Sequence, residues 1–270
     1  MTMPVFIRDY TDFYSSKNHA FNVGCMFRDP ATALNPNWTQ LPVGYHGRAS
    51  SIVISGTEVR RPKGQIAPDK TNPVWSECKR LDYELEMGAF VGKANALGEP
   101  VKVSDSRDHI FGFCLFNDWS ARDIQVWEYV PLGPFNAKNF ASTVSPWIIT
   151  SEALEPFKVS LPAQDPQPLE YLRDPDLSSY DISMAVSIKT PTSSKYQTLA
   201  VSNFKHLYWS VHQQLVHHTV TGCNLQVGDL FASGTISGTE KSEYGSLLEL
   251  TWAGKEKIQI EETGEERVFI

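Results

Sequence analysis

The sequence predicts a mainly β protein with few helices, which is an α+β fold and not a doubly wound α/β sheet. Three observations support this prediction: short strand-like runs recur along the chain, only one segment shows clear helical spacing, and helices do not alternate regularly with strands. The chain has 270 residues, of which 41% are hydrophobic and 20% are charged. This length and composition allow one large domain, or two small ones, with a sizeable core.

The first functional candidates lie in a polar segment that begins near Asp9. Asp12 and His19 are seven residues apart, so they would share one face if this segment were helical. Histidine is the usual general base near neutral pH, although a lone histidine is more often a hydrogen-bonded structural residue. Further along, the apolar run of residues 51–55 ends at Gly56, which predicts a short strand.

Residues 81–87 alternate apolar side chains with acids, which is the period-two pattern of a half-buried strand. Asp82, Glu84 and Glu86 are therefore expected on one face. Like charges on one face repel, and burial increases the cost, so a hard divalent cation would resolve the conflict. The alternative is a strand whose acidic face meets water. The apolar run 110–116 favours the cation, because it leads into a further carboxylate at Asp118.

The second half of the chain predicts a hairpin and one clear helix. Residues 182–188 alternate apolar with polar or small side chains, and residues 196–201 answer them after a Pro-Thr-Ser-Ser turn. A helix is predicted from Ser202, as its N-cap, to Gly222, because apolar residues between them follow helical spacing.

Near the end, residues 247–252 and 257–260 predict two strands around an Ala-Gly-Lys turn. Glu249 is unusual there, because it interrupts an apolar run and a buried carboxylate needs a partner. Residues 155–178 are rich in prolines and acids and predict a surface excursion between strands.

Charge and cysteine content restrict the class of protein. The net charge of −7 disfavours nucleic acid and anionic membranes as general partners. No apolar run approaches the ~18 residues of a membrane span, and we expect no signal peptide. No C-x-x-C spacing occurs, so the cysteines are expected to be free thiols in a reducing compartment, and we expect a cytoplasmic location. These cysteines are Cys25, Cys78, Cys114 and Cys223.

Four long motifs resemble the fumarylacetoacetase (fumarylacetoacetate hydrolase) family. They are residues 9–16, 41–48, 117–125 and 232–238, and the resemblance covers essentially the whole chain in order. It implies a rolled mixed β-structure that encloses the site. Residues 1–270 would form the catalytic domain, without the small SH3-like domain that precedes it in the family. We expect this domain to be incomplete at its C-terminus, because the chain stops as a new apolar run begins.

The resemblance also implies two metal ions. Calcium would be bound by four carboxylates, whose all-oxygen character suits Ca²⁺ or Mg²⁺ and argues against zinc or copper. Those carboxylates are Asp12, Glu84, Glu86 and Asp118. Magnesium is expected near Asp118, Lys138 and Ser142, where the family typically has threonine in place of Ser142.

The resemblance further implies catalytic and substrate-binding roles. His19 would activate water, Glu249 would orient His19, and an oxyanion would be stabilised by Arg122, Gln125 and Lys138. Judged without the resemblance, Arg122 and Gln125 are typical of an exposed helix face. The expected substrate-binding residues are Tyr14, Arg28, Tyr45, Gln125, Tyr129 and Thr235.

The implied activity is metal-dependent hydrolysis of the carbon–carbon bond of 4-fumarylacetoacetate to fumarate and acetoacetate, the last step of tyrosine and phenylalanine breakdown. A homodimer is expected by resemblance alone. Two alternatives remain open: another activity of the superfamily, such as acylpyruvate hydrolase, oxaloacetate decarboxylase or dienoate isomerase, or a truncated paralogue that is not an enzyme.

Overall fold

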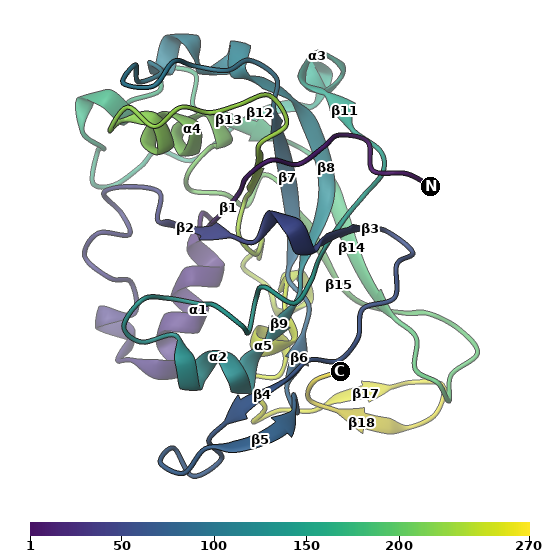
Figure 1. Cartoon of the computed structure of the whole chain (residues 1–270). Coiled ribbons are helices and arrows are strands. Elements are labelled where there is room, and N and C mark those ends of the chain that lie inside the picture. Colours follow the sequence, from purple (N-terminus) through teal and green to yellow (C-terminus); the bar gives the residue numbers. More distant parts are fainter.

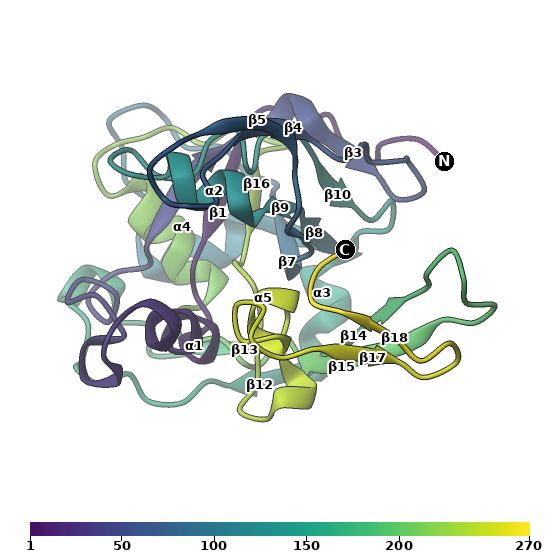
Figure 2. The same cartoon turned by 90° about the horizontal axis from the view of Figure 1, so that it is seen from below.

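The computed structural model describes all of residues 1–270, and Figures 1 and 2 show strands gathered around a curled central sheet with the helices at its margins. The predicted mainly β fold with few helices is therefore confirmed. The α-helices are α1 (Lys17–Phe27), α2 (Arg122–Glu128), α3 (Ser151–Leu154), α4 (Val211–Thr219) and α5 (Leu247–Leu250). No helix has both the length and the apolar composition needed to cross a membrane.

The central sheet is mixed, in the order β2-β1-β16-β7-β8-β10-β3, with β11 paired to β8. Two pairs are parallel, β1 with β16 and β10 with β3, and the other pairs are antiparallel. Its strands are β1 (Tyr10–Phe13), β2 (Gly44–Gly47), β3 (Ile52–Ile54), β7 (Leu85–Val91), β8 (Ile110–Asp118), β10 (Ser142–Val144), β11 (Ile149–Thr150) and β16 (Leu230–Ala232).

Five two-stranded ribbons surround this sheet, and Figure 1 shows two of them, β4–β5 and β17–β18, along its lower margin. They are β4 (Lys63–Ile66) with β5 (Val74–Glu77), β6 (Leu81–Asp82) with β9 (Ser120–Ala121), β12 (Lys158–Ser160) with β13 (Ser178–Tyr180), β14 (Ser183–Ile188) with β15 (Gln197–Asn203), and β17 (Ile258–Ile260) with β18 (Glu265–Arg267). The predicted strands near residues 51–55, 110–116 and 257–260 and the predicted 182–201 hairpin are confirmed.

Both faces of the sheet are covered by apolar side chains, as the period-two alternation of β7 and β8 requires. Met87 and Phe113 belong to the largest core cluster, which also contains Leu215 of α4. Phe90 and Phe116 belong to a second cluster, with Tyr10 of β1. Strands that bury both faces explain why β7 is entirely buried, its acid included.

Four elements differ from the prediction. The strand at residues 81–87 is broken between Asp82 and Leu85, so β6 pairs with β9 while β7 joins the central sheet. A break shifts the direction of side chains, and Asp82 is therefore not among the carboxylates that converge with Glu84 and Glu86. It accepts hydrogen bonds from the backbone of α5 instead.

The helix predicted with Ser202 as its N-cap begins eight residues later. Ser202 lies in β15, and the N-cap of α4 is Ser210, whose hydroxyl forms a capping box with Gln213. The apolar residues before Ser210 matched helical spacing because they are core residues, and the ring of Phe204 packs against those of Phe113 and Tyr180.

The two remaining differences affect the candidate site directly. Asp12 lies in strand β1 and His19 in helix α1, so the two are not on one helical face. Residues 247–250 form helix α5 and not a strand. Four mostly apolar residues fit either a helix or a strand, so their spacing could not distinguish the two structures.

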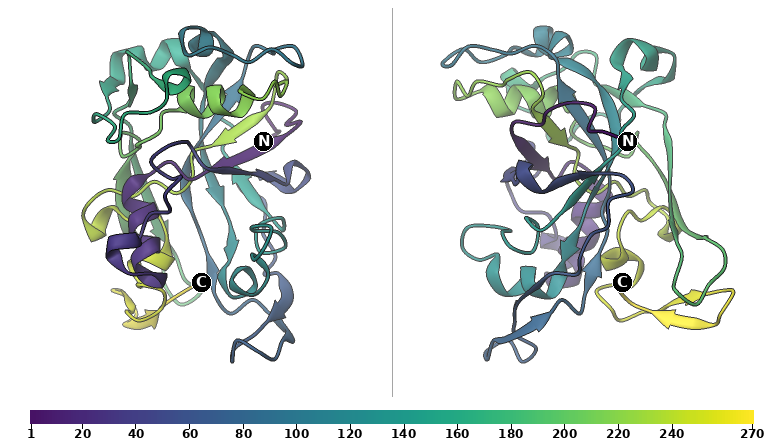
Figure 3. Two further views of the ribbon diagram at one scale, coloured as in Figure 1. Left: turned by 90° about the vertical axis from the view of Figure 1, so that its left-hand side faces the viewer. Right: turned by 45° about the vertical axis from the view of Figure 1, so that its right-hand side comes forward.

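The prediction for residues 155–178 is only partly right. The segment does connect strands, but Leu161 and Leu172 are buried. The two ends of the chain lie apart (Figure 3). Phe269 is buried, and the N–H of Ile270 donates to the carbonyl of Leu81 at 2.9 Å.

Candidate active site

Four buried carboxylates meet at one end of the central sheet. Asp12 comes from β1, Glu86 from β7 and Asp118 from the end of β8, while Glu84 immediately precedes β7. One oxygen of each lies within 4.8 Å of the others, and all four residues are at most 5% exposed. The structure thus brings together the four residues that the sequence analysis assigned to calcium.

The register of the sheet explains how these side chains can converge. β16 lies between β1 and β7, and its Ala232 is paired with Asp12 on one side and with Gly88 on the other. Residues paired across a sheet point to the same face, as do residues two apart on one strand, so Asp12 and Glu86 lie on one face of the sheet. Glu86 also accepts a hydrogen bond from the Gly234 N–H at 3.1 Å, which fixes one of its oxygens.

Two buried cations offset part of this negative charge. The Lys138 ammonium donates to Asp118 at 2.5 Å and also to Glu84. Arg122 forms an ion pair with Glu84 at 2.7 Å. The Ser142 hydroxyl donates to Asp118 at 2.6 Å. The three residues predicted for the second metal ion therefore do lie together, around Asp118.

The pKa values of these carboxylates are shifted in different directions. Burial, and then the charge of Asp118, raises the pKa of Asp12 well above its usual value. Burial and the charge of Asp12 do the same to the pKa of Glu86. Burial opposes ionisation of Glu84 as well, but Lys138 and Arg122 outweigh it and lower its pKa to about 2. Asp12 and Glu86 are thus the two carboxylates of the cluster that have no partner cation.

Asp12 and Glu86 also carry the unused ligand atoms. Oδ1 of Asp12 and Oε1 of Glu86 are buried and have no hydrogen-bond partner. Unpartnered buried oxygens of this kind are costly unless a cation binds them. Oxygens around one Ca²⁺ lie within roughly 5 Å of each other, since each is ~2.4 Å from the ion. The residues present therefore fit a hard divalent cation held by oxygen ligands, and they include no sulfur or imidazole ligand that would favour zinc.

Removal of bound cation should destabilise the protein. A cation that binds only the native state contributes about 2.7 kcal/mol at roughly 100 times its dissociation constant. For a chain of this size we expect chelation to lower the melting midpoint by about 5 to 10 °C. Differential scanning calorimetry before and after chelation measures this, and excess Ca²⁺ should restore the midpoint. A melting curve that chelation leaves unchanged would contradict the metal assignment.

A second buried constellation joins α1 to α5. Nδ1 of His19 lies 2.6 Å from Oε2 of Glu249, and both side chains are at most 5% exposed. Burial opposes ionisation of Glu249, but His19 and several hydrogen bonds hold its pKa below its usual value. An ionised carboxylate can only accept, so Nδ1 of His19 is the donor. This leaves Nε2 of His19 as the free basic nitrogen.

Three polar residues that the sequence analysis did not identify complete this arrangement. Asn22 donates to Oε1 of Glu249 at 2.9 Å, while the hydroxyls of Ser237 and Ser246 donate to Oε2 at 2.8 and 2.9 Å. One signal was present in the sequence, because Ser246 and Glu249 have the S-x-x-E spacing that marks a helix start. That spacing predicts α5 and places Glu249 in its first turn.

The pair His19 and Glu249, here called the dyad, and the carboxylate cluster lie close together. Burial raises the pKa of the Tyr14 phenol, and the charges of Glu249 and Glu84 both add to the rise. The Tyr14 ring packs edge-on against His19, with 5.4 Å between centroids. Tyr45, in strand β2 beside β1, donates to Asp118 at 3.2 Å.

The other predicted substrate-binding residues differ in burial and in their hydrogen bonds. Oε1 of Gln125 accepts from Arg122 at 3.3 Å, so its amide NH₂ remains a free donor. Thr235 is buried beside Gly234. Arg28 is exposed and donates to the Ala33 carbonyl. Tyr129, at the C-cap of α2, is 48% exposed and forms no side-chain hydrogen bond.

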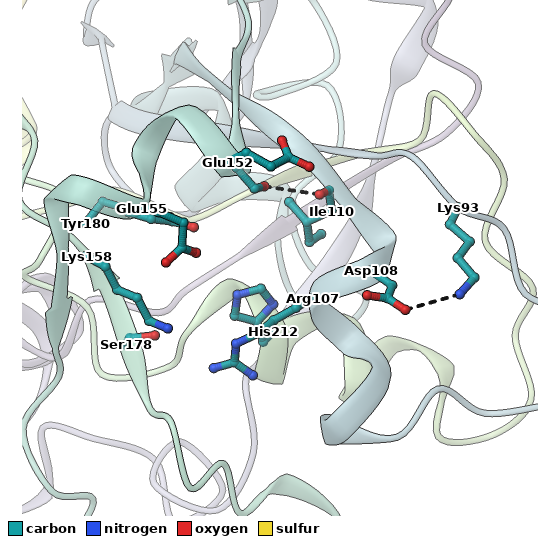
Figure 4. Close-up of a pocket in the computed structure, with 11 residues that line it drawn as sticks. Lys93, Arg107, Asp108, Ile110, Glu152, Glu155, Lys158, Ser178, Tyr180 and His212 are labelled. Atoms are coloured by element: carbon teal, nitrogen blue, oxygen red, sulfur yellow. Dashed lines mark hydrogen bonds and ion pairs between the residues drawn. The ribbon is translucent and has the colours of Figure 1, made fainter.

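A separate cavity of about 450 Å³ lies between α3, β13 and α4 (Figure 4). Its cations are already paired: Arg107 and Lys158 both contact Asp176, and Lys93 contacts Asp108. None of the predicted site residues lines it. We therefore place the candidate active site at the carboxylate cluster and the His19–Glu249 dyad.

Comparisons with known proteins identify the family of the chain. The family model described as "Fumarylacetoacetate (FAA) hydrolase C-terminal" matches residues 9–263. The chain is 56% identical to the fumarylacetoacetases of Dictyostelium discoideum, Mus musculus and Homo sapiens, over 100% of its own length. It spans 64% of the length of each of these relatives.

Solved structures with the same fold have lower identity. A 5-carboxymethyl-2-hydroxymuconate delta-isomerase from Mycobacterium smegmatis is 18% identical, with a TM-score of 0.54 over 86% of this chain and 68% of its own. A fumarylacetoacetate hydrolase from Exiguobacterium antarcticum is 17% identical, with a TM-score of 0.52 over 84% of this chain and 62% of its own. The family match extends over far more than half of the 270 residues, and the chain belongs to the fumarylacetoacetate hydrolase family.

Proposed function

We propose that this chain hydrolyses the carbon–carbon bond of 4-fumarylacetoacetate and releases fumarate and acetoacetate. The observation that carries the proposal is the buried His19–Glu249 pair beside four convergent carboxylates, in a chain 56% identical to fumarylacetoacetases. A base for water and a cluster of oxygen ligands are the two components that hydrolysis of a diketo acid requires.

In this proposal His19 is the general base. Its Nε2 takes a proton from water while Glu249, fixed through Nδ1, stabilises the imidazolium that results. The hydroxide attacks the carbonyl carbon beside the fumaryl group. Tyr14, whose ring packs against His19, would limit where the water and the substrate can lie.

The negative charge that develops on the carbonyl oxygen needs donors. Arg122, Gln125 and Lys138 are the proposed donors, and the first and last are buried cations with fixed partners. Cations already in position cost little reorganisation when the charge forms. The carbon–carbon bond then breaks, the electron pair leaves on acetoacetate as an enolate, and a proton completes the product.

The leaving group is the difficult part of this reaction, because a carbanion must depart. A divalent cation bound by Asp12, Glu84, Glu86 and Asp118 would supply Lewis-acid polarisation of the substrate's keto oxygens, which lowers the energy of an enolate. We propose Ca²⁺ there and Mg²⁺ near Asp118, Lys138 and Ser142. Tyr45, Arg28, Tyr129 and Thr235 are the further proposed substrate contacts.

We also propose a cytoplasmic homodimer that acts in tyrosine and phenylalanine breakdown. Four free cysteines suit a reducing compartment. The net charge of −7 favours neither nucleic acid nor an anionic membrane as a partner. Sedimentation at micromolar concentration tests the dimer.

A substrate panel separates this activity from others of the superfamily. One solved structure with the same fold is a delta-isomerase. Fumarylacetoacetate, an acylpyruvate and oxaloacetate should be assayed with equal concentrations of Ca²⁺ and Mg²⁺. We expect kcat/KM for fumarylacetoacetate to exceed the others by about 100-fold or more. A higher value for an acylpyruvate or for oxaloacetate would favour the alternative activity, and no turnover of any of the three would favour a chain that is not an enzyme.

A further inference from the structure

Asp82 occupies an unusual position between the two halves of the candidate site. It is fully buried in β6, and both carboxylate oxygens are used. Oδ1 accepts from the N–H of Leu247 at 2.7 Å. Oδ2 accepts from the N–H of Leu248 at 3.0 Å and from Nε of Arg122 at 2.8 Å. No other carboxylate of the chain connects α2 to α5 through side-chain hydrogen bonds of this kind.

The two backbone donors belong to the first turn of α5, where N–H groups have no partner within the helix. Leu247 and Leu248 directly precede Glu249, so bonds to their N–H groups determine how α5 is oriented. α5 has only four residues and cannot hold its own orientation by internal hydrogen bonds. The place of the Glu249 carboxylate, and with it the ring of His19, therefore depends on Asp82.

The third donor is Arg122, which links the Asp82 carboxylate to the proposed oxyanion-stabilising residues. Arg122 uses Nε for Asp82 and forms its ion pair with Glu84 through the far end of the guanidinium. A guanidinium held at two edges cannot rotate, so its direction is fixed before substrate arrives. Asp82 thus holds Arg122 on one side and the helix that carries Glu249 on the other.

We propose that Asp82 is a positioning residue. It sets the distance between the water-activating His19–Glu249 dyad and Arg122, the cation that would stabilise the oxyanion. It is not one of the four carboxylates of the cluster. This inference rests on the proposed function, because it assigns Asp82 to the same reaction. Displacement of a reacting group by ~1 Å costs about 100-fold in rate, so the loss of this link should appear in turnover.

Asp82→Asn is the informative change. Asparagine has the same shape, but its NH₂ must face either Arg122 Nε or a backbone N–H, and all three of these groups are donors. The control is Asp123→Asn. Asp123 follows Arg122 in α2 and likewise accepts three hydrogen bonds, from Cys78 Sγ at 3.0 Å, Lys79 N at 2.6 Å and Ile124 N at 3.1 Å. Asp123 touches neither the Arg122 guanidinium nor α5.

Both variants of the full chain should be compared with the parent for kcat, KM, Ca²⁺ binding and melting midpoint. We expect Asp82→Asn to lower kcat by about 100-fold or more with KM and Ca²⁺ affinity changed less than about threefold. The proton resonance of His19 Nδ1–H, assigned by its loss in His19→Ala, should shift or broaden in Asp82→Asn. In Asp123→Asn the melting midpoint should fall, but kcat and the resonance should stay at parental values.

The inference is overturned if folded Asp82→Asn keeps kcat and the His19 resonance of the control. If Asp82→Asn does not fold, Asp82→Glu takes its place, since it keeps the charge and moves it by one methylene. Failure of both to fold while Asp123→Asn folds would assign Asp82 to stability alone. If the parent does not hydrolyse fumarylacetoacetate, the proposed function fails, and the His19 resonance then decides the role of Asp82 by itself.

Discussion

The double variant Glu84→Gln with Glu86→Gln is expected to bind no divalent cation and to have no measurable turnover. Two of the four convergent carboxylates would become amides, which removes two negative charges from a cluster that includes the unpartnered Oε1 of Glu86. Hard cations bind weakly without carboxylate charge. Isothermal titration with Ca²⁺ and Mg²⁺, together with an assay on fumarylacetoacetate, measures both losses.

A matched control has the same change of charge elsewhere. Glu152 and Glu155 are exposed and line the separate cavity of Figure 4, so Glu152→Gln with Glu155→Gln should keep parental cation binding and turnover. Glu84 also pairs with Arg122 and Lys138, and circular dichroism must first establish that the site variant is folded. A folded Glu84→Gln, Glu86→Gln variant with full activity would exclude the cluster as the metal site.

Replacement of His19 by alanine should separate the base from the metal site. We expect kcat to fall by about 10³-fold or more, because water would lose its general base. Cation affinity and binding of a phosphinate analogue of the tetrahedral intermediate should stay near parental values, since His19 is not one of the proposed cation ligands. Rapid-quench turnover and calorimetric titration provide the two measurements.

His206→Ala is the control for the loss of a histidine. His206 lies 3.5 Å from Glu243 and forms no ion pair with Glu249, so its replacement should leave turnover unchanged. Near-parental turnover of His19→Ala would show that another group activates water.

Three of the four proposed metal ligands could be predicted from strand periodicity and strand ends, which are local signals, whereas Asp12 was linked to them only by the family resemblance. Glu84 and Glu86 follow period two, and Asp118 ends an apolar run. Asp82 belongs to the same pattern, yet the chain breaks its strand after Asp82 and directs it to α5. The break is set by pairing of β6 with β9, a contact between distant segments that no local pattern contains.

The dyad shows the same limit. His19 and Glu249 are 230 residues apart, and only the resemblance to a family linked them before the structure was known. Ser246 offered a local signal for α5 through its spacing to Glu249. Asn22 and Ser237 offered none, because their role depends on how α1 and the loop after β16 pack around Glu249. Tertiary packing of this kind determines which ordinary polar residues become part of a site.

The most direct test of the account is hydrolysis of fumarylacetoacetate by the purified 270-residue chain after chelation and after addition of Ca²⁺ and Mg²⁺. We predict no release of fumarate or acetoacetate from the metal-free protein, and equimolar release of both once cation is added. Full turnover by the metal-free protein would contradict the role of the carboxylate cluster. No turnover by folded, cation-loaded protein would contradict the proposed activity itself.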